Sequence, residues 1–152
     1  MTLMPAKGGT PIALAQLYFA PRASWSPDSS RIAYATDPDG TIGELKTVDV
    51  QTHETTILGD FVGDVLWTRR GIYAYDSNLQ RLMLVPADGR RPTRVAAYEF
   101  GHPVAAPISG DWVAVCNTYC EVMVIYSHDG KRLLERALGG GDAEPVVAVT
   151  SG

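Results

Sequence analysis

The sequence predicts an all-β fold, a β-propeller segment of about 3.5 four-stranded blades with a repeat period of about 41 residues. Residues 4–15 and 85–96 share five of twelve positions at an offset of 81. Residues 103–110 and 145–152 share five of eight positions at an offset of 42, the same separation as between Trp25 and Trp67. A period of this length, built from short apolar runs and turn residues, is typical of propeller blades.

The elements follow from apolar runs separated by turn signals. In the first repeat the expected strands are ASW, RIAYAT, ELKTVDV and TTIL, joined by the turns SPDSS, DPDG and QTHE. The second repeat has DVLW, GIYAYD, RLMLVPA and TRVA, and the third has VAAPI, WVAVCN, CEVMVIYS and RLLERAL. Ile32, Ile72 and Val113 occupy equivalent places in the second strand of each repeat. We name the four strands of a blade A to D in chain order.

The repeats divide the chain into parts of one propeller domain. We expect a leading partial blade of C and D strands, three whole blades, and strand A of a trailing partial blade, at 1–19, 20–59, 60–99, 100–141 and 142–152. Such a segment is a four-bladed ring that lacks one strand, a window cut from a longer propeller, or a half-propeller that self-assembles into a closed ring. Open strand edges at both ends favour pairing with other chains, so self-association is expected.

Composition excludes several classes of function. The 152 residues are 45% hydrophobic and 20% charged, and the net charge of −4 provides no global basic field for nucleic acid. No apolar run approaches the ~18 residues that a membrane-inserted helix needs. The first twenty residues lack the pattern of a signal peptide.

One segment resembles a known repeat. ASWSPDSSRIAYATDPDG looks like the TolB-type, or WD40-like, propeller repeat, in which a Trp-Ser-Pro-Asp-Gly turn precedes an apolar strand. Here Trp25-Ser26-Pro27-Asp28-Ser29 has serine in place of the usual glycine, and MPAKGG and VPADGR fit the end of strand C. We expect Pro27 to preset the turn, Asp28 to bond backbone amides and Trp25 to fill the wedge between blades.

The resemblance implies a propeller in one of two settings. One is a periplasmic protein that binds partners of envelope complexes, and the other is a propeller that gates a prolyl-oligopeptidase-type hydrolase. Family analogy therefore favours a periplasmic or extracytoplasmic location, and the ligand stays open because fold does not determine function.

Catalysis, metals and cofactors are not expected within these residues. Asp37-Pro38-Asp39-Gly40 lacks the further ligands of a calcium loop and is interpreted as a hairpin turn. The three histidines fall in different turns, no Gly-x-Ser-x-Gly elbow exists, and the three glycines at 139–141 are interpreted as a linker. Cys116 and Cys120 flank a three-residue turn and face each other, so either a disulfide or two free thiols fit, depending on the compartment.

The turns predict two faces of opposite charge. The A–B and C–D turns share one face of a propeller and hold seven basic residues: Lys7, Arg69, Arg70, Arg90, Arg91, Lys131 and Arg132. The D–A and B–C loops share the other face and hold these acidic residues: Asp37, Asp39, Asp60, Asp64, Asp76, Glu99, Asp142 and Glu144. The competing interpretation is that turns are simply polar, with Asp28, Asp88, Asp111 and Asp129 diluting the basic face.

Aromatic residues in the D–A and B–C loops suggest a binding surface for a protein or peptide. The candidate partner-binding residues are Tyr18, Phe19, Arg22, Tyr98, Glu99, Phe100, His102 and Tyr119. Aromatic residues beside arginine are typical of binding hot spots. Alternatively, Tyr18, Phe19 and Phe100 pack between blades as core. The leading hypothesis is a non-catalytic binding or scaffold module; the alternatives are an accessory hydrolase propeller, with catalysis outside this chain, and the self-assembling half-propeller.

Overall fold

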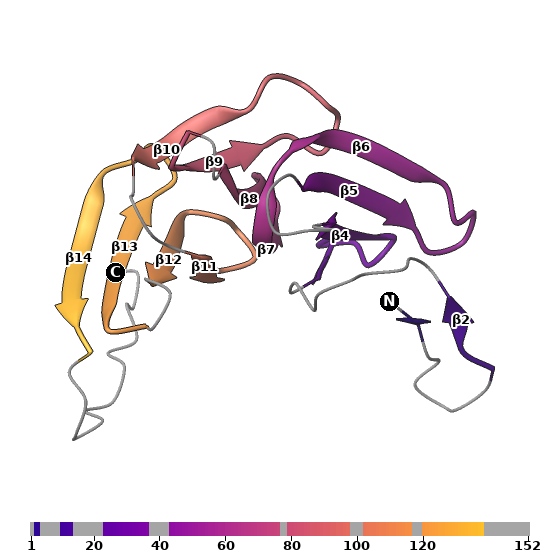
Figure 1. Ribbon diagram of the computed structural model, residues 1–152, viewed down its shortest axis with the longest axis horizontal. Coiled ribbons are helices and arrows are strands. Elements are labelled where there is room, and N and C mark those ends of the chain that lie inside the picture. The colour runs from indigo at the N-terminus through magenta and orange to yellow at the C-terminus, as the bar shows by residue number, and fades with distance from the viewer. Residues whose placement is uncertain are drawn as a thin grey trace.

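Three four-stranded antiparallel sheets stand side by side in an open arc (Figure 1). The structure is a computed structural model. It describes residues 2–3, 10–13, 23–36, 43–76, 79–97, 102–116 and 120–138. Each four-stranded sheet is one blade, so the chain is an all-β propeller segment. None of the described residues forms a helix that could cross a membrane.

Each blade is a meander, in which strand order in the sheet follows strand order in the chain. Blade 1 consists of β3 (Ser24–Trp25), β4 (Arg31–Thr36), β5 (Glu44–Asp49) and β6 (Thr55–Asp60). Blade 2 consists of β7 (Val62–Thr68), β8 (Gly71–Asp76), β9 (Arg81–Val85) and β10 (Thr93–Ala97). Blade 3 consists of β11 (His102–Ala105), β12 (Trp112–Cys116), β13 (Val122–Ser127) and β14 (Arg132–Ala137). At the N-terminal end of the arc, β1 (Thr2–Leu3) pairs with β2 (Ile12–Ala13).

The core lies between the blades rather than within one of them. Side chains of blades 1 and 2 form the first buried cluster: Ala33, Ala35, Leu45, Phe61, Val65, Ile72, Ala74 and Val85. Side chains of blades 2 and 3 form the second: Tyr73, Leu82, Val95, Ala96, Val113, Val115, Val124 and Tyr126. Each blade therefore buries apolar surface by packing its broad face on its neighbour.

Strand β8 contributes to both clusters because successive side chains of a strand point to opposite faces. Ile72 and Ala74 pack toward blade 1, and Tyr73 packs toward blade 3. All three are completely buried. This double burial explains why the strand GIYAYD reads as an almost continuous apolar run instead of alternating with polar residues.

Trp25 does not fill a wedge between blades, contrary to the sequence-based expectation, because 46% of its surface is exposed. Trp25 pairs with Ile32 and Trp67 pairs with Ile72, so the two tryptophans hold equivalent places in blades 1 and 2. Trp67 packs against the cluster between these blades. The hydroxyl of neighbouring Ser24 accepts a hydrogen bond from the backbone N–H of Trp67 at 2.8 Å, so Ser24 faces blade 2 and Trp25 points away from it. Among the described residues, the side that Trp25 faces has no four-stranded sheet.

The trailing strand expected at 142–152 lies outside the described residues. The same is true of most of the leading segment, of which the structure describes the short strands β1 and β2 and two residues beside β2. The boundaries proposed for these partial blades therefore remain predictions.

Candidate functional site

Four turns on one face of the arc share the same backbone geometry. They span residues 26–29, 86–89, 107–110 and 127–130, and in each the fourth N–H donates to the first carbonyl, at 2.9 to 3.2 Å. The fourth residue is left-handed in every case: Ser29, Gly89, Gly110 and Gly130 have φ of 60°, 77°, 78° and 89°. Two are A–B turns and two are C–D turns, and we call the surface that they form the turn face.

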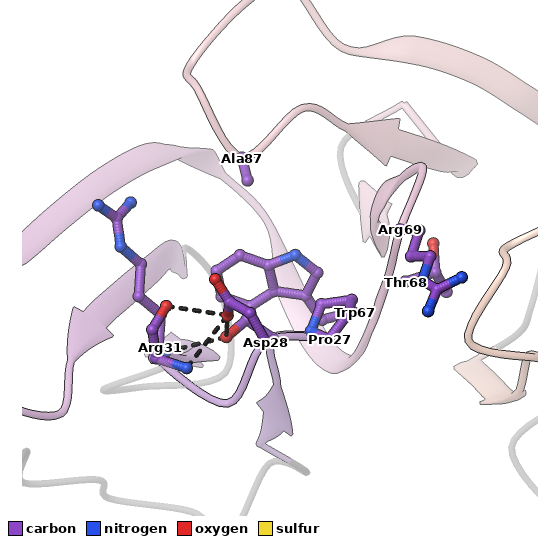
Figure 2. Close-up of a pocket in the computed structure, with 9 residues that line it drawn as sticks. Pro27, Asp28, Arg31, Trp67, Thr68, Arg69 and Ala87 are labelled. Atoms are coloured by element: carbon purple, nitrogen blue, oxygen red, sulfur yellow. Dashed lines mark hydrogen bonds between the residues drawn. The ribbon is translucent and has the colours of Figure 1, made fainter.

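The first of these turns is closed by the carboxylate of Asp28. Its Oδ1 accepts hydrogen bonds from the Ser26 hydroxyl at 2.6 Å, the Ser30 hydroxyl at 2.9 Å and the Ser30 N–H at 3.1 Å. The Ser26 hydroxyl oxygen in turn accepts from the Arg31 N–H at 2.9 Å (Figure 2). The bond from Ser26, followed by those from Ser30, lowers the pKa of Asp28 to about 2. The turn is therefore fully bonded, and Asp28 charged, at neutral pH.

We expect this turn to loosen only in strong acid. The pKa of Asp28 is depressed from 3.8 to about 2, so its contribution to folding is present above the unfolded value and is lost as the pH falls through the folded value. A carboxyl-carbon NMR titration should place the Asp28 midpoint near 2. The Asp28→Asn variant should lose stability less steeply over the same pH range. A midpoint at the ordinary aspartate value would contradict the bonded turn.

A groove of about 410 Å³ opens on the turn face between blades 1 and 2. The residues that line it are Ser26, Pro27, Asp28, Ser30, Arg31, Trp67, Thr68, Arg69 and Ala87. Figure 2 shows the indole ring of Trp67 beside Pro27 and Asp28, with Ala87 above the ring and with Arg69 set apart from it, next to Thr68. The half-buried indole is thus presented to the groove by strand β7 while it packs against the cluster beneath.

A second groove of about 230 Å³ continues from the first over blade 2. It shares Trp67, Thr68, Arg69 and Ala87 with the first, and it adds Arg70, Gly71, Pro86, Asp88 and Arg90. We call the two together the turn-face groove. Three turns build it: the A–B turns of blades 1 and 2 and the C–D turn of blade 2.

The arginine-bearing turn of this groove is fixed to blade 3. The backbone N–H of Arg69 donates to the Ile108 carbonyl at 2.8 Å, and the Arg70 guanidinium binds Asp111 at 2.8 and 3.1 Å. Below them, the buried Tyr73 hydroxyl donates to the Gly110 carbonyl at 2.7 Å, and burial raises the pKa of Tyr73 to about 12. These contacts hold the backbone of Arg69 in one position.

Among the residues that the structure describes, some of the charged side chains that line the groove have partners of opposite charge, and others do not. Arg90 pairs with Asp88 at 2.7 Å, and Arg70 pairs with Asp111. The hydrogen bond from the backbone N–H of Arg90 is the main cause that lowers the pKa of Asp88, and the hydrogen bond from the Arg70 side chain is the main cause that lowers the pKa of Asp111. Asp28 is bonded within its own turn. Within the described part of the chain, the exposed guanidinium of Arg69 has no carboxylate partner. Among the described residues, the groove therefore combines an arginine that has no carboxylate partner with the half-buried indole of Trp67.

The residues expected to bind a partner fall mostly outside the described residues. These are Tyr18, Phe19, Arg22, Tyr98, Glu99, Phe100 and Tyr119. The backbone of His102 begins β11 and lies opposite Cys116. That surface on the D–A and B–C loops thus stays a prediction, and the described groove lies on the A–B and C–D face instead.

Cys116 and Cys120 form a disulfide in the structure, with an S–S distance of 2.04 Å and a Cα–Cα distance of 4.9 Å. The bond spans the B–C turn of blade 3, between β12 and β13. Within the described residues, no group of three His, Cys, Asp or Glu side chains could hold a metal ion.

Sequence reasoning placed Arg69 on the basic face and Trp67 at the start of its repeat, but it did not join them into a site. The signal was present in the alignment of Trp25-Ser26-Pro27-Asp28 with Trp67-Thr68-Arg69-Arg70. It puts arginine where the first repeat has proline. Only the position of blade 1 against blade 2 shows that the two turns border one groove.

Comparison with solved structures then decides the type of propeller. The fold matches a protein described as TolB from Agrobacterium tumefaciens with a TM-score of 0.66 and 19% sequence identity, over 90% of this chain. The chain has the fold of a TolB-type β-propeller. It spans 56% of the length of that TolB structure.

A second solved structure shares this TolB-type fold in part. Acylaminoacyl peptidase, solved in complex with Z-Gly-Gly-Phe-chloromethyl ketone, matches with a TM-score of 0.51 and 14% identity, over 86% of this chain and 26% of the peptidase. No protein-family model and no curated protein sequence matches the chain. At these identities the likeness establishes the fold, and function has to be argued from the site.

Proposed function

We propose that the chain is a non-catalytic binding or scaffold module that holds a protein or peptide partner on its propeller surface. The turn-face groove is the observation that carries this proposal. Its lining combines an accessible indole, apolar walls at Pro27 and Ala87, and an exposed guanidinium at Arg69. Tryptophan and arginine are the residue types most enriched among those that dominate binding energy.

The rigidity of the groove supports the same function. The turn of Asp28 is bonded within itself, and the turn of Arg69 is bonded to blade 3. A partner would therefore meet a surface that needs little ordering on binding, which lowers the entropic cost of association. The groove is lined by turns from two blades, so several residues of one extended segment can contact it.

Selection of linear peptides from a random display library against the purified chain tests this function. We expect peptides that bind with micromolar dissociation constants and that lose about thirtyfold or more in affinity to Trp67→Ala, because truncating a hot-spot tryptophan costs ~2 kcal/mol or more. Leu79→Ala is the matched control, since Leu79 is an apolar residue 53% exposed in the B–C turn of blade 2, away from the groove. No enrichment, or equal losses in the two variants, would contradict the proposal.

A second candidate function is the accessory propeller of a peptidase or related hydrolase. The likeness to part of acylaminoacyl peptidase supports it. The two candidates differ in the native protein: a fluorophosphonate probe should label a serine of the polypeptide that contains this chain if the hydrolase candidate is right.

The third candidate, ring closure by self-assembly, draws support from the open arc of three blades and would give a discrete dimer in light scattering.

A further inference from the structure

We propose that the turn-face groove is specific for an acidic peptide segment, in which a carboxylate pairs with Arg69 while an adjacent apolar side chain packs on the indole of Trp67. This inference rests on the proposed function and adds to it the chemistry of the partner. It depends on three properties of the groove, which are its charge, its apolar floor and its fixed backbone.

The charge of the groove opposes that of the whole chain. Four arginines line it, Arg31, Arg69, Arg70 and Arg90, against the two aspartates Asp28 and Asp88 and a third, Asp111, which pairs with Arg70 from blade 3. The complete chain has a net charge of −4. A local positive surplus on an acidic protein attracts a short anionic segment, whereas the overall charge repels a long polyanion.

The carboxylates of the groove are already engaged, which disfavours a basic partner. Asp28 accepts three hydrogen bonds from Ser26 and Ser30, and Asp88 binds Arg90. A lysine from a partner would compete with Arg90 for Asp88, and at Asp28 it would meet a carboxylate whose Oδ1 already accepts three hydrogen bonds. A carboxylate from a partner would instead meet Arg69, whose guanidinium is exposed and has no carboxylate partner among the described residues. Arg69 therefore gives the groove a binding position for an anion.

The floor beside Arg69 is apolar and flat. The indole of Trp67 lies between the A–B turn of blade 1 and Ala87 in the C–D turn of blade 2 (Figure 2). An aromatic or aliphatic side chain that covers this ring removes apolar surface from water and excludes water from the neighbouring ion pair. A carboxylate next to an apolar residue in an extended segment satisfies both parts of the groove together.

The backbone that bears Arg69 is fixed before a partner arrives. Its N–H is bonded to Ile108, and the next residue is bonded to Asp111. The backbone positions of Arg69 and Trp67 in the groove are thus set without a rearrangement of the turn. This favours recognition of a defined spacing between the acidic and apolar side chains of the partner.

Fluorescence anisotropy with defined peptides tests the inference. The probe is fluorescein-labelled SGDFEDGS, and the comparison peptides are SGNFQNGS, without charge, and SGDSEDGS, without the aromatic ring. We expect the probe to bind about fivefold or more tightly than either comparison peptide, and to weaken as salt rises from 20 to 300 mM.

Variants locate the contact on the chain. Arg69→Gln should weaken binding of SGDFEDGS about fivefold and leave SGNFQNGS unchanged, as expected for loss of one exposed ion pair. Arg94→Gln is the matched control, because Arg94 is exposed on β10 and lines neither groove. Trp67→Leu should weaken both peptides that contain phenylalanine and keep the circular dichroism spectrum of the wild type.

Three results would overturn the inference. They are equal affinities for SGDFEDGS and SGNFQNGS, equal losses in Arg69→Gln and Arg94→Gln, or a tighter, Arg69-dependent complex with an oligothymidylate of eight nucleotides, which would make the ligand a nucleic acid. The peptide-display experiment distinguishes failure of the acidic-peptide inference from failure of the proposed binding function. Selected peptides that depend on Trp67 but lack acidic residues would leave the binding module in place and remove the acidic partner.

Discussion

Gly130→Ala is expected to lower the free energy of unfolding by about 3 kcal/mol or more. A Cβ at this position would lie 2.1 Å from the carbonyl oxygen of Val95 and 3.2 Å from its carbonyl carbon. Val95 belongs to β10 of blade 2 and is 5% exposed, so the C–D turn of blade 3 is pressed against buried backbone of its neighbour. Relief of the clash requires the two blades to separate at this point.

Gly89→Ala is the matched control for this variant. Gly89 ends the equivalent turn of blade 2 with a similar left-handed φ of 77°, but a Cβ there would meet no atom within 4 Å. It should therefore lose only the ~1 kcal/mol of a left-handed alanine. Urea unfolding measures both variants. Equal losses would show that the Gly130 turn does not contact blade 2 as closely as the structure has it.

Tyr73→Ala is expected to destabilise the fold by about 4 kcal/mol. Tyr73 has no exposed surface and belongs to the cluster between blades 2 and 3. Removing its ring deletes a large apolar contact and leaves a cavity that two β-sheets cannot close by a local adjustment. The transition should shift to lower urea concentration with little change in its slope, because the surface exposed on unfolding stays almost the same.

Tyr73→Phe separates the ring of Tyr73 from its hydroxyl. This variant keeps the buried ring and loses the bond to the Gly110 carbonyl, so it should cost about 1 kcal/mol. If Tyr73→Ala costs no more than Tyr73→Phe, the ring does not fill the space between the blades. Affinity of Tyr73→Phe for selected peptides then shows how far the groove depends on the contact with blade 3.

The strands could be predicted because their signals are local. Apolar runs such as RIAYAT and GIYAYD and the turns between them define the meander of each blade, and the repeat gives the number of blades. The place of Trp25 could not be derived in the same way. Its burial depends on what stands on the far side of blade 1, whereas the equivalent Trp67 is covered by blade 1 itself.

The turn-face groove was beyond the reach of sequence analysis for a different reason. Pro27 and Ala87 lie in turns and Trp67 lies in β7, and the three are separated by about half a repeat or more along the chain. Their juxtaposition depends on the angle between two blades, which no local pattern encodes. The pairing of the groove arginines also depends on contacts between blades, since Arg70 binds Asp111 of blade 3 and Arg69 beside it has no carboxylate partner among the described residues.

The alternating side chains of β8 have a consequence for how the molecule comes apart. Because Ile72 and Ala74 serve one interface and Tyr73 the other, blade 2 takes part in every buried contact between whole blades of the described chain. Blades 1 and 3 each share one such interface. In a quasi-one-dimensional chain of repeats this favours partial opening from the ends, so amide exchange should reach blade 2 last. The groove lies over the junction of blades 1 and 2, so it is lost whenever blade 1 separates from blade 2. Its stability is therefore limited by the stability of this one interface.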